Sequence, residues 1–210
     1  MIFTDANVIY EAMRLAIKSG DRDRYVTQLY QVNHLLYTAM LQKSLTDGTY
    51  KPELGNKFIL SERGKIRFVT NNTMTDKVVN HIVCDKILTP ALEKFLIHDN
   101  GASQKGKGVS FHRERFEKHL RDYFKTHGTN EGFILLGDFS GYYANIRHDV
   151  CSKVLAHFLK RSDIPVEDLR MAWKILIGIF ETFRVDVSRF SDSEIRAMYI
   201  SKVEAMLNFG

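Results

Sequence analysis

The sequence predicts a helix-rich α+β fold. Several stretches carry apolar residues at the three- and four-residue spacing of an amphipathic helix. Two short runs between residues 57 and 70 have the composition of β-strands, and residues 133–136 form a continuous apolar run of strand length. Hydrophobic residues make up 44% of the 210 residues and charged residues 26%, which is typical of a globular chain with a sizeable core.

Charge and cysteine content limit the classes of function. The net formal charge of +5 is mildly basic, which fits a nucleic-acid partner and equally fits a solvated surface. No apolar run approaches the roughly 18–20 residues that span a bilayer, and no signal-peptide pattern opens the chain. We therefore expect a cytoplasmic protein without a membrane partner. Cys84 and Cys151 lack metal-ligand spacing and are expected to be small core residues in a reducing compartment.

Two helices are predicted at the N-terminus. Asp5 is expected to cap the first helix and Gly20 to end it. A second, longer helix should follow, with one apolar face formed by Tyr25, Leu29, Val32, Leu35, Leu36, Ala39 and Met40. We expect this helix pair to close a core.

A β-hairpin is predicted over residues 57–60 and 65–70. Residues 61–64 join the two runs, and Gly64 is expected to take a positive φ. Alternation along the second run places Lys65 and Arg67 on the same face as Val69. Basic residues on a rigid ribbon can hold a triphosphate, although a solvated strand face explains the same residues.

A helix and a basic loop are predicted next. Thr75 is expected to cap the helix, Pro90 to interrupt it, and its core stripe to consist of Val78, Val79, Ile82, Val83, Ile87 and Leu88. Residues 101–108 are rich in glycine, which lets the backbone approach a ligand, and they include Lys105 and Lys107. A flexible loop is the alternative, and the spacing is not that of a Walker loop.

A basic helix is predicted from Ser110 to about Lys125. Its packing side should consist of Phe111, Phe116, Leu120, Tyr123 and Phe124. Arg113, Arg115 and Lys118 belong to the remaining surface, which suits a nucleic-acid backbone, although charged helix faces are usually just solvated.

The apolar run 133–136 is predicted to be a buried strand that ends just before Asp138. A carboxylate there would need a cation or a strong donor, and Mg²⁺ is one such cation, whereas a helix-capping or turn role is the alternative. Three helices should follow. Asp149 is expected to cap the first and Pro165 to start the second, while Ser191 and Glu194 should form a capping box for the third.

Taken in this order, the segments resemble the N-terminal half of a reverse transcriptase of the prokaryotic kind that includes group II intron, retron and diversity-generating enzymes. No single segment is decisive, and the resemblance rests on their order and spacing from about residue 50 to residue 150. The matching segments are residues 57–67, 76–81, 88–93, 101–108, and 138–146 with His148 and Asp149.

The resemblance implies a role for individual residues. Asp138 is similar to the first metal-binding aspartate of the polymerase palm, with the Phe139 carbonyl as a secondary ligand of Mg²⁺. Tyr143 resembles the aromatic gate that favours dNTPs, and Lys65 and Arg67 resemble the fingers residues that grip the triphosphate. Lys105, Lys107, Arg113, Arg115 and Lys118 would line the template path. The implied activity is RNA-directed DNA synthesis on a primed RNA template, with two Mg²⁺ ions, or Mn²⁺, in the complete site.

One departure from the family matters. A reverse transcriptase carries a second acidic motif, aromatic-x-Asp-Asp, and no Asp-Asp pair occurs in these 210 residues. Asp138 alone cannot hold two Mg²⁺ ions. We therefore expect a fragment of a retroelement-type polymerase, with fingers over residues 1–130 and a truncated palm over 131–210, that is inactive by itself.

Other functions remain open at this point. A non-catalytic nucleic-acid-binding module could keep the fingers shape, and a phage-defence relative could make DNA without a template. A helical scaffold in which Asp138 is only a cap is unrelated to either.

Overall fold

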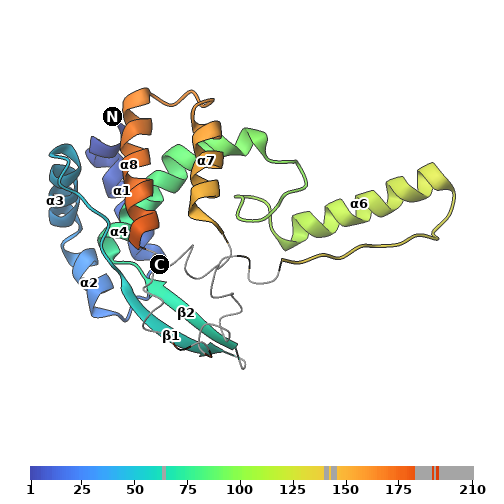
Figure 1. Cartoon of the computed structure of the whole chain (residues 1–210), viewed down its shortest axis with the longest axis horizontal. Helices are drawn as coiled ribbons and strands as arrows, with labels where there is room; N and C mark the ends of the chain where they lie inside the picture. The colour runs from blue at the N-terminus through green and yellow to red at the C-terminus, as the bar shows by residue number, and fades with distance from the viewer. Residues whose placement is uncertain (63–64, 140–141, 143–145, 183–190, 192, 194–210) are drawn as a thin grey trace. The chain divides into compact units, whose positions relative to one another are not determined.

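A computed structural model describes residues 1–62, 65–139, 142, 146–182, 191 and 193 (Figure 1). Their contacts group the chain into two units. The first unit comprises Met1–Leu92 with Ser140–Gly210, and the second unit is Glu93–Phe139. The described residues are mostly helical with one two-stranded sheet, as expected for a helix-rich α+β chain. The fingers–palm boundary near residue 130 stays a prediction, because these units reflect packing and not function.

The core of the first unit forms around α1 (Ala6–Ser19), which packs against α3 (His34–Thr46) and α4 (Met74–Ile82). Asp5 begins α1 as predicted, since its Oδ1 accepts a hydrogen bond from Asn7 N at 2.8 Å. Gly20 follows its last residue. The largest fully buried side chains of the core are Phe3, Ile9, Met13, Leu45, Ile82 and Ile87, with Val78, Val79 and Val83.

The single long helix predicted after residue 25 is wrong. The structure has two helices, α2 (Tyr25–Val32) and α3, which are separated at Asn33. Asn33 Nδ2 donates to Leu29 O at 3.1 Å and so satisfies a carbonyl at the end of α2. The break changes which face of α3 meets α1. Thr38, Leu41 and Leu45 are buried, whereas Leu35, Leu36 and Met40 are exposed, so the predicted apolar face is wrong for α3.

The predicted hairpin is confirmed. Strands β1 (Asn56–Glu62) and β2 (Lys65–Asn71) pair antiparallel, with Leu60 opposite Arg67 and Glu62 opposite Lys65. Gly64, with its expected positive φ, lies outside the described residues. Gly55 directly precedes β1, and a Cβ there would lie 2.3 Å from Asn71 O. Only glycine allows this close approach of the two chain segments.

Thr73, and not Thr75, caps α4. Thr73 has an extended backbone, and its Oγ1 accepts a hydrogen bond from Asp76 N at 3.2 Å. Thr75 is already inside the helix, where its hydroxyl lies 2.7 Å from Tyr30 Oη. The sequence offers a threonine at both positions, and the extended chain that leaves β2 determines which of them comes before the first turn.

The helical path continues after α4. A π-helical stretch, Val83–Leu88, leads into α5 (Thr89–Leu92) and the 3-10 turn Glu93–Phe95, so Pro90 does not end it. Proline has no N–H to donate, and the wider π turn directly before α5 is where the hydrogen-bond pattern changes. Val83 and Ile87 are buried as predicted, but Cys84 is exposed and Cys151 is half-buried. The expected core placement is therefore wrong for Cys84, which faces away from that stripe.

Two further helices belong to the first unit. In α7 (His148–Leu159), Asp149 is in the first turn and pairs with Arg147 at 2.9 Å, so its predicted capping role is wrong. Helix α8 (Val166–Thr182) starts directly after Pro165, as predicted. Asp168 in its first turn is buried and accepts a hydrogen bond from Ile2 N at 2.7 Å. The helix predicted after Ser191 lies outside the described residues, apart from Ser191 itself and Ser193.

In the second unit, the predicted basic helix is present as α6 (Val109–His127). It ends at Gly128, which has φ +70°. No residue of α6 is buried, and its expected packing residues Phe116, Leu120, Tyr123 and Phe124 are exposed. The second unit holds no other long helix or strand against which this side could pack. The predicted packing side is thus an exposed apolar stripe.

Candidate functional site

The hairpin carries the two basic residues predicted to bind a triphosphate. Lys65 and Arg67 lie two positions apart on β2, opposite Glu62 and Leu60 of β1. Residues two apart on a strand share one face, so the ladder fixes the spacing of these positions. Tyr143, the third predicted nucleotide contact, lies outside the described residues.

Asp76 of α4 joins the segment before β1 to the segment after β2. The sequence analysis gave this residue no role. Asp76 is 4% exposed. Its Oδ1 accepts a hydrogen bond from Tyr50 Oη at 2.7 Å, and its Oδ2 accepts from Glu53 N at 3.1 Å and Thr73 Oγ1 at 2.9 Å. Burial, together with this hydrogen bond to Asp76, raises the pKa of Tyr50 far above its usual value, so the phenol stays a donor.

Asp138 and Phe139 belong to the second unit, and their surroundings differ from the prediction. Residues 133–136 form no strand, and Phe133, Leu135 and Leu136 are exposed. The prediction of a buried strand is therefore wrong, since the described sheet consists of β1 and β2 alone. Asp138 is exposed, and its Oδ1 accepts a hydrogen bond from Phe139 N at 2.9 Å.

The predicted magnesium ligands can be tested against this geometry. Mg²⁺ takes six oxygen ligands, of which the protein usually supplies one or two carboxylates. Asp138 and the Phe139 carbonyl offer one carboxylate and one neutral oxygen. Across the part of the chain that the structure describes, no three His, Cys, Asp or Glu side chains form a group that could hold a metal. Asp138 and the Phe139 carbonyl would therefore supply only part of a two-ion site.

The basic side chains of α6 are largely engaged in ion pairs along the helix. Arg113 Nε lies 3.0 Å from Glu117 Oε1, and Arg121 Nη2 lies 3.6 Å from the other oxygen of the same carboxylate. Lys118 Nζ lies 2.6 Å from Asp122 Oδ2, which lowers the pKa of Asp122. These exposed pairs are weak, so phosphate groups could compete for the same cations.

Arg115 differs from the other predicted nucleic-acid contacts, because it holds the preceding loop. Its Nε donates to Asp99 Oδ1 at 2.5 Å, and His119 Nε2 lies 2.5 Å from Asp99 Oδ2. The hydrogen bond from Arg115, followed by those from His119 and His98, lowers the pKa of Asp99. Arg115 is therefore a structural residue in this geometry.

The two predicted loop lysines have different surroundings. Lys107 Nζ donates to His98 O at 2.9 Å and lies 5.2 Å from the centre of the Phe111 ring. Lys105 is exposed and has no ion-pair partner among the described residues. The loop is thus anchored to α6 through Lys107 and Asp99, and Lys105 is its more accessible cation.

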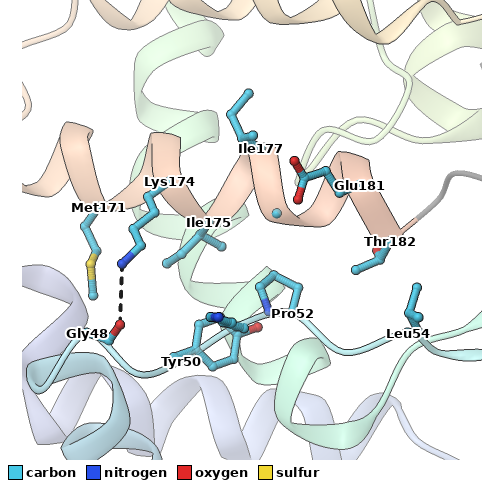
Figure 2. Close-up of a pocket in the computed structure, with 12 residues that line it drawn as sticks. Gly48, Tyr50, Pro52, Leu54, Met171, Lys174, Ile175, Ile177, Glu181 and Thr182 are labelled. Carbon is cyan, nitrogen blue, oxygen red and sulfur yellow. Dashed lines mark hydrogen bonds between the residues drawn. The ribbon is translucent and has the colours of Figure 1, made fainter.

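A cavity of about 450 Å³ lies between α8 and the segment from Gly48 to Leu54 (Figure 2). Its lining is mostly apolar, and Figure 2 shows Tyr50 and Pro52 facing Ile175. One polar link crosses it, where Lys174 Nζ donates to Gly48 O at 3.4 Å. The lining lacks a group of converging polar side chains, which a specific ligand site would have.

No family model matches this chain, and neither does any curated protein. The resemblance to reverse transcriptases is therefore carried by the residues and their order alone. Among the described residues, no helix has both the length and the apolar character required to cross a membrane.

Proposed function

We propose that this chain is the fingers and first palm segment of an RNA-directed DNA polymerase of the prokaryotic reverse-transcriptase kind. One observation carries the proposal. The β1–β2 hairpin forms over the residues for which the resemblance expects the triphosphate-gripping ribbon, and it holds Lys65 and Arg67 two positions apart. Arginine and lysine at this spacing suit the charge of a dNTP triphosphate.

The nucleic-acid partner in this proposal is a primed RNA template, bound in the cytoplasm. Exposed cations of the second unit would contact its phosphates, with Lys105, Arg113 and Lys118 as the principal candidates. The ion pairs of Arg113 and Lys118 do not oppose this role, because exposed pairs contribute only about 0–1 kcal/mol each. Arg115 and Lys107 would support the loop that presents them.

Magnesium, when bound, would supply the charge that activates the primer hydroxyl and stabilises the leaving pyrophosphate. Asp138 would contribute one of its ligands. A complete site needs further carboxylates, and no Asp-Asp pair occurs in the 210 residues. We expect the chain to bind nucleotides and nucleic acid without extending a primer.

A second candidate is a non-catalytic nucleic-acid-binding module. It is favoured by the exposed position of Asp138, whose carboxylate contacts only the amide of its neighbour among the interactions seen. A third, untemplated DNA synthesis, would use the same hairpin. The binding module would not use dNTPs, and the untemplated polymerase would join them without RNA.

Nucleotide binding tests the proposal directly. The affinity of the purified 210-residue chain for fluorescent dATP should fall tenfold or more in Arg67→Ala, since a charge-assisted contact is lost. Lys57→Ala is the matched control. Lys57 pairs with Thr70, three positions from Arg67 on β2, so its position belongs to the other face of the hairpin. Equal effects of the two substitutions, or no dATP binding by the unchanged chain, would contradict the nucleotide role of the hairpin.

Primer extension separates the candidates. With a labelled primer on RNA, dNTPs and Mg²⁺, we expect binding without product. Templated product would show that the chain is active by itself, and product formed without RNA would favour the untemplated polymerase. RNA binding without dATP binding would favour the binding module.

A further inference from the structure

The middle of strand β1 is not packed into the core. Phe58, Ile59 and Leu60 of β1 are exposed, and β2 is the only strand that β1 pairs with in the described chain. A two-stranded ribbon is marginally stable by itself. The segments that join its two strands to the helices are therefore where we look for what fixes its orientation.

Both ends converge on one carboxylate. The chain enters β1 through Glu53 and leaves β2 through Thr73, and Asp76 Oδ2 accepts a hydrogen bond from each of them, at 3.1 and 2.9 Å. Its other oxygen accepts from Tyr50 Oη, three residues before Glu53. Asp76 thus joins the entry segment, the exit segment and α4.

The helix that carries Asp76 is a firm anchor. Val78, Val79 and Ile82 of α4 are fully or almost fully buried in the core of the first unit. Asp76 lies in the first turn of α4, where the helix dipole favours a negative charge. A buried carboxylate is stable only with several donors, and Asp76 has three of them in addition to its backbone contact with Thr73.

We propose that Asp76 is the positioning residue of the β1–β2 hairpin, which clamps both of its ends to α4. The role in nucleotide binding rests on the proposed function, whereas the clamp itself does not. An asparagine keeps only one of the two acceptor oxygens and loses the negative charge, so its NH₂ group would face Tyr50 Oη and that hydroxyl would have to accept instead of donate.

Hydrogen exchange in the full chain tests the clamp. Tyr50→Phe removes one donor and keeps the ring, and Asp76→Asn removes an acceptor. The control is Tyr37→Phe, because Tyr37 stacks on Tyr30 and its hydroxyl has no hydrogen-bond partner among the described residues. We expect the β1 and β2 amides to exchange at least tenfold faster in Tyr50→Phe and Asp76→Asn, with the α1 amides unchanged.

Two results would overturn the clamp. One is hairpin exchange in Tyr50→Phe that equals that of Tyr37→Phe. The other is acceleration of α1 and the hairpin by the same factor in Tyr50→Phe, which would indicate a general loss of stability. If Asp76→Asn does not fold, Tyr50→Phe still decides between these outcomes.

The same samples separate the clamp from the proposed function. Tyr50→Phe and Asp76→Asn should bind dATP more weakly than the unchanged chain does. The loss of affinity should be no greater than that in Arg67→Ala. An unchanged chain that fails to bind dATP would overturn the proposed function, and the exchange pattern would still decide the clamp.

Discussion

The Arg115 guanidinium and the Asp99 carboxylate form a close ion pair, with Nε 2.5 Å from Oδ1, across 16 residues of sequence. It joins the start of the glycine- and lysine-rich loop to the second turn of α6. Lys107 makes a further link by donating to His98 O. These contacts tie the loop, for which a flexible segment was the alternative interpretation of the sequence, to α6, and Lys105 within it is exposed.

Acid should release this loop. The hydrogen bond from Arg115, with those from His119 and His98, lowers the pKa of Asp99 below the unfolded value of about 3.9. A carboxylate with a lowered pKa contributes stability above the unfolded pKa and loses that contribution as the pH falls toward the folded pKa. We expect the Arg115 Nε–H resonance to shift only below about pH 4. In Asp99→Asn, the Arg115 Nε–H resonance should have the chemical shift of the unpaired side chain at all pH values. A shift of this resonance that begins near neutral pH in the unchanged chain would contradict the ion pair.

Glu117 should restrain nucleic-acid binding by α6. Its carboxylate pairs with both Arg113 and Arg121, so Glu117→Gln frees two cations. We expect tighter binding of single-stranded RNA and a slope of log K against log[salt] that is steeper by up to roughly 1.4, since each of the two new phosphate contacts contributes roughly 0.7. Filter binding between low and moderate salt measures both. Glu114→Gln is the control, because it changes the net charge equally and Glu114 has no ion-pair partner among the described residues. Equal effects of Glu117→Gln and Glu114→Gln would argue against contacts between α6 and the phosphate backbone of RNA.

Substituting single side chains by alanine tests which residues of the first unit form its buried core. Ile82→Ala should lower the free energy of unfolding by about 2–5 kcal/mol, because Ile82 is 1% exposed within the core. Leu36→Ala should cost less than about 1 kcal/mol, since its side chain already contacts solvent. Urea denaturation measures both. A large cost at Leu36 would support the single long helix that the sequence predicts, in place of α2 and α3.

A side chain at position 55 should destabilise the first unit. An alanine Cβ would lie 2.3 Å from Asn71 O, which is backbone and cannot rotate away. We expect Gly55→Ala to reduce the free energy of unfolding by about 1–3 kcal/mol. Gly137→Ala, where a Cβ meets open space, should change it by less than about 0.5 kcal/mol. Similar thermal shifts for both variants would contradict the close approach of the hairpin ends.

Features that depend on neighbours along the chain could be predicted from the sequence. Asp5 begins α1, Pro165 precedes α8, and the hairpin pairs in the predicted place. These features are determined within a few residues, because the groups that satisfy one another are close in sequence. The same rule failed at Thr75 and Asp149, which lie inside their helices. The positions of Lys65 and Arg67 on one strand follow from the same local rule.

The features that needed the tertiary structure depend on distant groups. A helix could be predicted over the residues of α3, but its buried face could not. The break at Asn33 and the position of α1 decide that Leu41 and Leu45 are buried and Leu36 is not. Residues 133–136 are apolar enough for a strand, yet a strand forms only where another strand accepts its hydrogen bonds. Asp76 and Asp99 look like ordinary acids in the sequence, and each gains its role from donors that folding brings to it.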